Sequence, residues 1–139
     1  MNAVISISGV QGVHTDEQDL IEFVTDGVYS RTESGYEINY PESELTGLYG
    51  TLTRIMVCPD SVTVERSGAF TSTMVFRQGE SSRFLYETPY GSATMGINTR
   101  RINASMDDDG GELRIDYVVN MEHAVVSRNK LIMSVRPKS

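Results

Sequence analysis

Arg66 is the residue whose type and position most directly indicate binding chemistry. It follows Val62 and Val64 at every second position, so in a β-strand the three side chains lie on one face. If that face points inward, the guanidinium lies in or at the rim of an apolar interior. Its planar set of donors could there bind a carboxylate or phosphate of a ligand. The alternative is a structural role, in which the guanidinium caps backbone carbonyl groups or pairs with Glu65, Glu87 or Asp116.

Three tyrosines form the second group of candidate ligand contacts. Tyr86 shares a strand face with Phe84, and Tyr117 continues the alternating apolar pattern that starts at Leu113. A phenol has a rigid apolar body and a polar tip, which suits a pocket for a small molecule. Tyr90 lies in a Thr-Pro-Tyr-Gly turn and is a candidate for the rim of such a pocket. The alternative is that these tyrosines only fill the core, since tyrosine is a common strand residue.

The acidic residues indicate a metal site or a catalytic site less strongly than Arg66 and the tyrosines indicate a ligand site. Asp107, Asp108 and Asp109 resemble a calcium loop only superficially, because the alternating oxygen ligands and distal glutamate of an EF-hand are missing. An Asp-Gly hairpin tip explains the run without a metal. Glu42 and Glu44 flank Ser43 and could form a carboxylate pair for catalysis, but we expect them to be solvated loop charges.

Other reactive groups show no supporting pattern. His14 and His123 are far apart and lack zinc-ligand spacing with each other or with Cys58, for which we expect a buried, inert thiol. No nucleophile elbow, Walker or dinucleotide-binding motif occurs. The sequence therefore indicates no metal and no cofactor, and an enzyme is less strongly indicated than a binding or structural protein.

The elements that would position these residues are β-strands. Apolar and polar residues alternate with period two along most of the chain, as at Ile5 and Ile7, and no sustained helical stripe occurs. Gly27 in mid-strand predicts a bulge or a sharp bend. The alternation changes phase near Arg100-Arg101, which predicts a bulge or tight turn there. Residues 107–111, Asp-Asp-Asp-Gly-Gly, are the strongest hairpin signal.

About ten strands separated by short turns predict one all-β domain over residues 1–139. Sequential hairpins without long crossovers favour an antiparallel up-and-down β-barrel of about 8–10 strands. A closed barrel also leaves no exposed sheet edge. A barrel of roughly this size has an interior that side chains fill, or that holds one small ligand.

The charge and composition of the chain limit the classes of molecule that it is expected to bind and the compartment in which it is expected to occur. The net charge of −7 repels phosphate backbones and anionic membrane surfaces, so neither nucleic acid nor a membrane is expected, although a locally basic pocket stays open. No apolar run approaches the roughly 20 residues of a membrane helix, and Met1–Gly12 lacks the basic start of a signal peptide. The single Cys58 excludes an internal disulfide. Together these features predict a soluble protein of the reducing cytoplasm.

Six short motifs follow one another along the chain. They are Val64-Glu65-Arg66-Ser67-Gly68, Met74-Val75-Phe76, Tyr86-Glu87-Thr88-Pro89-Tyr90-Gly91, Asn98-Thr99, Ile115-Asp116-Tyr117 and Asn129-Lys130-Leu131-Ile132-Met133-Ser134-Val135. In this order they resemble the YwiB-like family of small, uncharacterised bacterial proteins with a domain of unknown function. The resemblance is sharpest over residues 62–135. It implies a calycin-like, lipocalin-like β-barrel and supplies no established activity.

Two hypotheses about function follow. In the first, the barrel holds a small, partly apolar or anionic ligand, with Arg66, Tyr86, Tyr90 and Tyr117 as the polar contacts. It requires an internal cavity on the order of a few hundred Å³. In the second, a filled barrel acts as a structural or protein-interaction module or a homodimer, with Tyr36, Ile38 and Tyr40 as an aromatic stripe on its outer face.

Overall fold

The computed structural model describes residues 1–12, 18–44, 47–122 and 124–138, and these residues form ten β-strands. The strands are β1 (Asn2–Gly12), β2 (Gln18–Arg31), β3 (Tyr36–Pro41), β4 (Thr51–Val57), β5 (Val62–Gly68), β6 (Ser72–Phe76), β7 (Ser81–Thr88), β8 (Gly91–Asp107), β9 (Gly110–Met121) and β10 (Ala124–Pro137). Among the described residues there is no helix of the length and apolar character that crossing a membrane requires.

The ten strands form one antiparallel sheet, in the order β6-β5-β4-β3-β2-β1-β10-β9-β8-β7. β1 pairs with β10 along almost its whole length, which joins the two ends of the chain. The sheet edges are β6 and β7, and between them Thr71 and Glu87 exchange two backbone hydrogen bonds of 2.9 Å. The sheet is therefore a nearly closed up-and-down barrel, and this confirms the all-β barrel that the alternation and the turns predicted.

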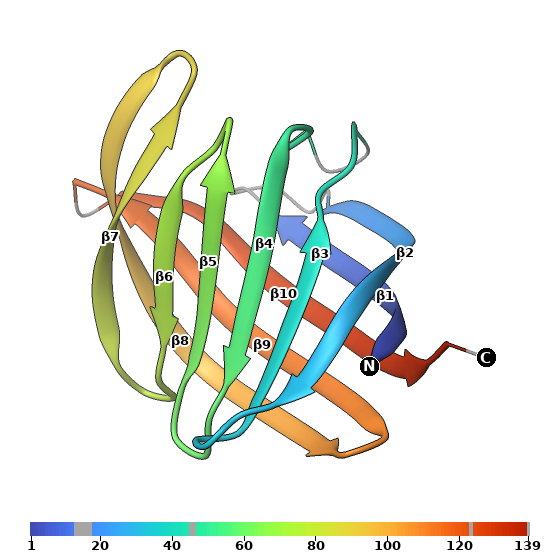
Figure 1. The fold of residues 1–139 in the computed structure, drawn as a ribbon. Coiled ribbons are helices and arrows are strands. Elements are labelled where there is room, and N and C mark those ends of the chain that lie inside the picture. The colour runs from blue at the N-terminus through green and yellow to red at the C-terminus, as the bar shows by residue number, and fades with distance from the viewer. Residues whose placement is uncertain (13–17, 45–46, 123, 139) are drawn as a thin grey trace.

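The barrel is flattened into two layers (Figure 1). Strands β2 to β6 run side by side in the front layer, and β1, β10, β9 and β8 cross behind them. The β7–β8 hairpin projects beyond the front strands at one end, the end toward which the β5 arrow points. Most of the core lies between the two layers, because each strand turns alternate residues toward the opposite layer.

The period-two alternation of apolar and polar residues along the strands determines which side chains form the core. Ile5 on β1, Ile55 on β4 and Ile115 on β9 are each at most 1% exposed, and their sequence neighbours face outward or are only partly buried. Fully burying one such side chain contributes about 1.5–3 kcal/mol relative to leaving it exposed. The buried apolar residues form one connected cluster. This cluster includes Phe23, Tyr29, Ile38, Tyr40, Val62, Val64, Met74, Phe76, Phe84, Ile97, Leu113, Met133 and Val135.

Gly27 allows two strands and the core to meet closely. β2 pairs with β1 through Val28, and it pairs with β3 only from Val28 to Arg31. A β-carbon at position 27 would lie 2.5 Å from the carbonyl oxygen of Asn39 and would also overlap the end of the Ile5 side chain. The glycine signalled by the sequence therefore marks a point of close packing where β2 gains its second neighbour.

The two irregularities predicted near residues 100 and 110 are confirmed. The pairing of β8 with β9 shifts register between Thr99 and Arg101, which is a β-bulge at Arg100. The same two strands meet in a hairpin where Asp107 pairs with Gly110. Gly110 and Gly111 have φ angles of 121° and 151°, a region that residues with a side chain rarely adopt. The turn itself therefore requires the two glycines.

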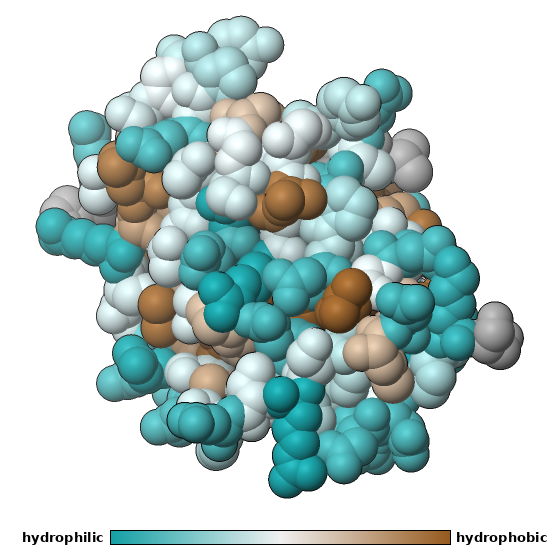
Figure 2. All heavy atoms as spheres, viewed as in Figure 1, coloured by the Kyte–Doolittle hydropathy of each residue, from teal (hydrophilic) through white to brown (hydrophobic). Residues whose placement is uncertain are grey.

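The proposed outer stripe on β3 was wrong. Ile38 is fully buried and Tyr40 is 5% exposed, because the pairing of β3 with β4 sets them opposite the inward-facing Ile55 and Thr53. The ring of Tyr36 stacks on Tyr29 at 5.2 Å instead of facing outward alone. On the face shown in Figure 2, hydrophobic residues are scattered among polar ones and form no broad patch.

Candidate functional site

A cavity of about 200 Å³ lies inside one end of the barrel, where β1, β3 and β5 end and β2 and β4 begin. The aromatic rings of Phe23, Phe76 and Tyr117 surround this space. The interior is therefore hollow at this end, whereas the remaining buried apolar side chains pack into the core cluster. The lining residues are Ile7, Gly9, Gln11, Ile21, Phe23, Tyr40, Glu42, Leu48, Ile55, Val64, Arg66, Met74, Phe76, Tyr117 and Leu131.

Arg66 points into this cavity. It continues the inward face of β5 after Val62 and Val64, which are 1% and 4% exposed. The Nε atom of Arg66 lies 3.7 Å from Oε1 of Glu42, and the two side chains are 24% and 2% exposed. The Nη1 atom donates only a weak contact of 3.9 Å to the sulfur of Met74. The sequence left the direction of this strand face open, and the structure turns it inward. The ionic partner of Arg66 is Glu42, a residue that the sequence analysis did not pair with it.

Glu42 is part of the site, and the interpretation of Glu42 as a solvated loop charge was wrong. Its backbone N–H donates to the carbonyl oxygen of Thr51 at 2.9 Å, so the β3–β4 ladder continues one residue past Pro41. The residue therefore stays on the inward face that Ile38 and Tyr40 occupy. The hydroxyl of Thr53 donates to its carboxylate at 2.5 Å. Glu44 is exposed, so the two glutamates do not form a pair.

Two tyrosines complete the polar end of the cavity. Burial raises the pKa of Tyr40, the neighbouring carboxylate of Glu42 raises it further, and Arg66 offsets part of the rise. Burial also raises the pKa of Tyr117, again against an opposing effect of Arg66. Both phenols therefore stay protonated at neutral pH, and the cavity presents neutral hydroxyl groups beside one compensated ion pair. Tyr117 is held by an edge-on contact with Phe76, with ring centroids 4.8 Å apart.

Two buried polar atoms at this end lack a hydrogen-bond partner among the described residues. They are Nε of Arg66 and Oγ of Ser72. The two residues are direct cross-strand partners on β5 and β6, and Ser72 is 3% exposed. Side chains in such pairs have β-carbons about 4.5–5.5 Å apart. Buried polar groups usually have partners, so this pair of neighbouring atoms points to a site that accepts a further polar group.

The other two predicted ligand tyrosines lie elsewhere. Tyr86 is half-buried at the β6–β7 seam, with its ring 6.1 Å from that of Phe70 and 6.5 Å from that of Phe84. Tyr90 is 95% exposed in the turn between β7 and β8. The structure therefore brings Arg66 and Tyr117 together at the cavity but not Tyr86 or Tyr90.

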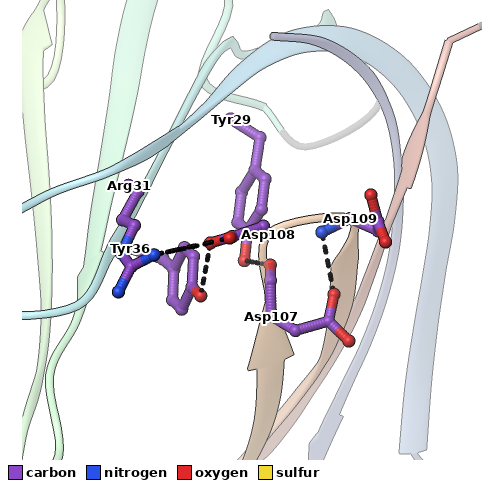
Figure 3. Close-up of polar contacts among 6 residues, drawn as sticks. All are labelled: Tyr29, Arg31, Tyr36, Asp107, Asp108 and Asp109. Carbon is purple, nitrogen blue, oxygen red and sulfur yellow. Dashed lines mark hydrogen bonds and ion pairs between the residues drawn. The ribbon is translucent and has the colours of Figure 1, made fainter.

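The opposite end of the barrel is closed by the β8–β9 hairpin (Figure 3). The hydroxyl of Tyr29 donates to the backbone carbonyl of Asp107 at 2.8 Å, and the hydroxyl of Tyr36 donates to the Asp108 carboxylate at 3.0 Å. Arg31 pairs with the same carboxylate at 3.4 Å. Burial raises the pKa of Tyr29, and the hydrogen bond to Asp108 raises that of Tyr36. The aspartate run thus ties the turn to β2 and β3.

The remaining reactive residues do not gather at the cavity. Cys58 is a free, half-buried thiol just after β4. His14 and His123, considered above as ligands, lie outside the described residues. In the part of the chain that the structure describes, no three His, Cys, Asp or Glu side chains are grouped closely enough to hold a metal ion.

The fold and the cavity define an all-β, ten-stranded antiparallel barrel with a hollow end. The chain belongs to the family described as a domain of unknown function, DUF1934, whose model matches residues 5–133. It is 29% identical over 100 residues to the "Uncharacterized beta-barrel protein YwiB" of Bacillus subtilis (strain 168), covering 72% of this chain and 69% of that protein. The crystal structure of ywiB protein from Bacillus subtilis superposes with a TM-score of 0.88 at 22% identity. The superposition covers 99% of this chain and 92% of the other.

These findings confirm the resemblance drawn from the motifs and the barrel that it implies. The name of the relative and the description of the family give a β-barrel fold and no activity.

Proposed function

We propose that this protein binds one small, partly apolar molecule in the cavity, with Arg66 holding its polar head group. The observation that carries the proposal is the buried Nε atom of Arg66, which faces the cavity and lacks a hydrogen-bond partner among the described residues. A buried donor without an acceptor costs about 1–3 kcal/mol. An acceptor atom of a ligand would recover that cost.

The size and lining of the cavity limit the ligand. Cavities of about 150 Å³ hold a benzene molecule, so about 200 Å³ suits one ring with a short substituent. The walls are mainly aliphatic and aromatic, as in other small-molecule sites. Phe23, Phe76 and Leu131 would contact the ring, and Arg66, Tyr40 and Tyr117 would surround its head group.

The charges favour a neutral head group over an anion. Glu42 lies 3.7 Å from Arg66 and compensates its charge. A carboxylate placed on Arg66 would also approach the Glu42 carboxylate, which repels it at short range. A carbonyl or amide oxygen accepts the same hydrogen bond without that repulsion. The ligand class that fits is therefore a small aromatic or aliphatic amide or ketone.

We place this function in the cytoplasm. The chain has one cysteine, Cys58, and its thiol is free. Proteins of oxidising compartments commonly carry paired cysteines, whereas free thiols persist where glutathione and thioredoxin keep them reduced.

The alternative function is a homodimer or protein-interaction module that uses the outer face. Leu20, Val24 and Val28 on β2 favour it, since they are 60%, 65% and 45% exposed. However, Glu22 and Asp26 alternate with them along the strand, so the apolar surface is interrupted by carboxylates. A two-fold dimer through this face would bring each patch against its own copy and place Glu22 near Glu22. A monomer in sedimentation equilibrium contradicts the dimer.

Binding is tested by NMR titration with three probes that share a ring and differ in head group: benzamide, benzoate and benzylamine. We expect the order of affinity benzamide, benzoate, benzylamine. Arg66→Met should abolish the preference for benzamide. The matched control is Arg54→Met, because Arg54 faces outward from β4 and pairs with Glu37.

A second variant tests the charge argument. Glu42→Gln removes the opposing carboxylate while keeping an acceptor for Thr53. Benzoate should then bind at least about tenfold more tightly than it binds the native protein, because the Arg66 charge is no longer compensated. Equal binding of the three probes by the native protein, or no binding to the cavity residues, contradicts the proposal.

A further inference from the structure

The outer face of β8, β9 and β10 is basic, although the whole chain carries a net charge of −7. The cations of these strands are all exposed, and they outnumber the carboxylates Asp107, Glu112 and Asp116. They are Arg100, Arg101, Arg114, Arg128, Lys130 and Arg136. A cluster of one sign on a molecule of the opposite sign attracts anions locally and repels them elsewhere. Binding of an anion would therefore be confined to this face.

The bulge in β8 concentrates the charge at one point. Arg101 pairs in register with Asp116, and Asp116 pairs with Lys130 on the next strand. Because of the register shift between Thr99 and Arg101, Arg100 is an extra residue opposite the same part of β9. Bulges of this kind redirect side chains and are common next to functional sites.

A surface groove of about 340 Å³ lies at this point. Arg100, Arg128 and Lys130 line it together with Asp116, and Val10 contributes an apolar wall. The groove lies on the outside of the barrel, whereas Arg66 faces the interior. Tyr117 is common to the two linings, but the charged groups differ, since Arg66 and Glu42 line only the cavity and Arg100, Arg128 and Lys130 line only the groove. Substitution of these charged groups therefore tests the two sites independently.

The groove contains charged groups without partners among the residues that the structure describes. None of Arg100, Arg128 and Lys130 forms an ion pair there, since the ion pairs found in that part of the chain involve Arg31, Arg54, Arg66 and Lys138. Oδ1 of Asp116 is buried and has no hydrogen-bond donor. Three cations thus lack an anion at the place where a buried acceptor lacks a donor.

We propose that this groove binds a small phosphate monoester of a polyol or sugar. The phosphate would lie between Arg100, Arg128 and Lys130, which supply charge-assisted donors. A hydroxyl group next to the phosphate would donate to Oδ1 of Asp116. A plain phosphate ion satisfies the cations but brings no alcohol hydroxyl to the carboxylate, and a neutral polyol satisfies only the carboxylate. The combination of the two groups in one molecule is what the groove matches.

The first test is calorimetric titration of the full chain with glycerol 3-phosphate and with inorganic phosphate at low ionic strength. We expect glycerol 3-phosphate to bind more tightly than inorganic phosphate, and both to weaken as salt is added. Arg128→Gln should lower the affinity for glycerol 3-phosphate by about tenfold, as loss of a hydrogen bond to a charged group does.

The matched control is Arg136→Gln, on the same strand and also exposed but outside the groove. It should change the affinity by less than about twofold, since it alters only the long-range field. Equal losses for the two variants would mean unspecific attraction by net charge and would overturn the proposal. So would the absence of saturable binding at millimolar glycerol 3-phosphate. Arg66→Met should leave this binding unchanged, which separates its outcome from that of the cavity.

Asp116→Asn tests the hydroxyl contact. The variant removes a negative charge from the groove, so inorganic phosphate should bind it more tightly. Glycerol 3-phosphate should gain less, because its hydroxyl then meets a neutral acceptor in place of a carboxylate. The ratio of the two affinities should fall by at least about threefold. An unchanged ratio would show that Asp116 does not contact the ligand and would overturn the assignment of a polyol phosphate.

Discussion

The Arg66–Glu42 pair allows a quantitative prediction for stability. Two unit charges 3.7 Å apart attract each other by about 4.5 kcal/mol at an effective dielectric constant of 20. The cost of taking both groups out of water opposes this attraction. Glu42 is almost fully buried, with a side-chain exposure of 2%, whereas Arg66 at 24% keeps some contact with solvent. The net coupling should therefore be well below the Coulomb figure, at about 2 kcal/mol.

A double-mutant cycle measures this coupling. Arg66→Met leaves a buried carboxylate without its cation and should lower the free energy of unfolding by about 3 kcal/mol. Glu42→Gln should cost about 1 kcal/mol, since the uncompensated guanidinium can turn toward water. The double variant should then cost about 2 kcal/mol, because no unpaired charge is left inside the barrel.

The assay is urea unfolding followed by far-ultraviolet circular dichroism, since the chain has no tryptophan. A coupling of about 2 kcal/mol supports a buried, interacting pair. Additive effects of the two substitutions, to within about 0.5 kcal/mol, would refute it and would mean that both groups are solvated.

Three further predictions concern the rest of the barrel. Gly27→Ala should destabilise the protein by more than about 2 kcal/mol, because the new β-carbon meets the backbone of β3. Gly9→Ala, whose β-carbon would have nothing within 4 Å, should change the free energy of unfolding little in the same assay. The raised pKa of Tyr40 predicts that stability falls as pH rises above the ordinary tyrosine value of 10.0, since only the unfolded chain then loses the proton. Tyr40→Phe should make that fall less steep between pH 9 and pH 11, and the remainder comes from Tyr29 and Tyr117, whose pKa values are also raised. Asp108→Asn should cost less than about 1 kcal/mol, because its ion pair is exposed, and a loss of several kcal/mol would contradict this account of the hairpin.

Much of the fold was predictable because strand period and turn chemistry are local properties. The bulge near Arg100 follows from a change of alternating phase, and the hairpin at residues 107–111 follows from the backbone angles that its glycines permit. The closure of the barrel, by contrast, depends on the pairing of β1 with β10, which are separated by most of the chain. No short window contains that pairing, and it was inferred only from the number of strands.

The candidate site was predictable in part. The period-two pattern placed Arg66 and Tyr117 each on the face of an apolar series, and both of these faces line the cavity. The pattern alone did not say that the face of Arg66 points inward. Glu42 was missed because Pro41 suggested the end of the strand, although the alternation of Ile38 and Tyr40 extends to it. Proline lacks an N–H group but keeps its carbonyl, so it is compatible with a strand whose next residue still pairs. Following the alternation one residue past the proline would have found Glu42.

The positions of Tyr86 and Tyr90 could not be derived from strand period. Tyr86 lies in the strand that forms one edge of the sheet, and which core it faces depends on how the two edges meet. Tyr90 follows Pro89 in a hairpin that projects from the barrel, and the sequence gives no direction for that projection.

The central claim is that the hollow end of the barrel holds a small molecule through Arg66. Native mass spectrometry of protein purified from the cells that make it tests this most directly, in parallel with Arg66→Met and Arg54→Met. The account predicts a bound species of small mass on the native protein and on Arg54→Met, and its loss from Arg66→Met. A ligand-free mass for the native protein, or the same bound species on all three, would contradict it.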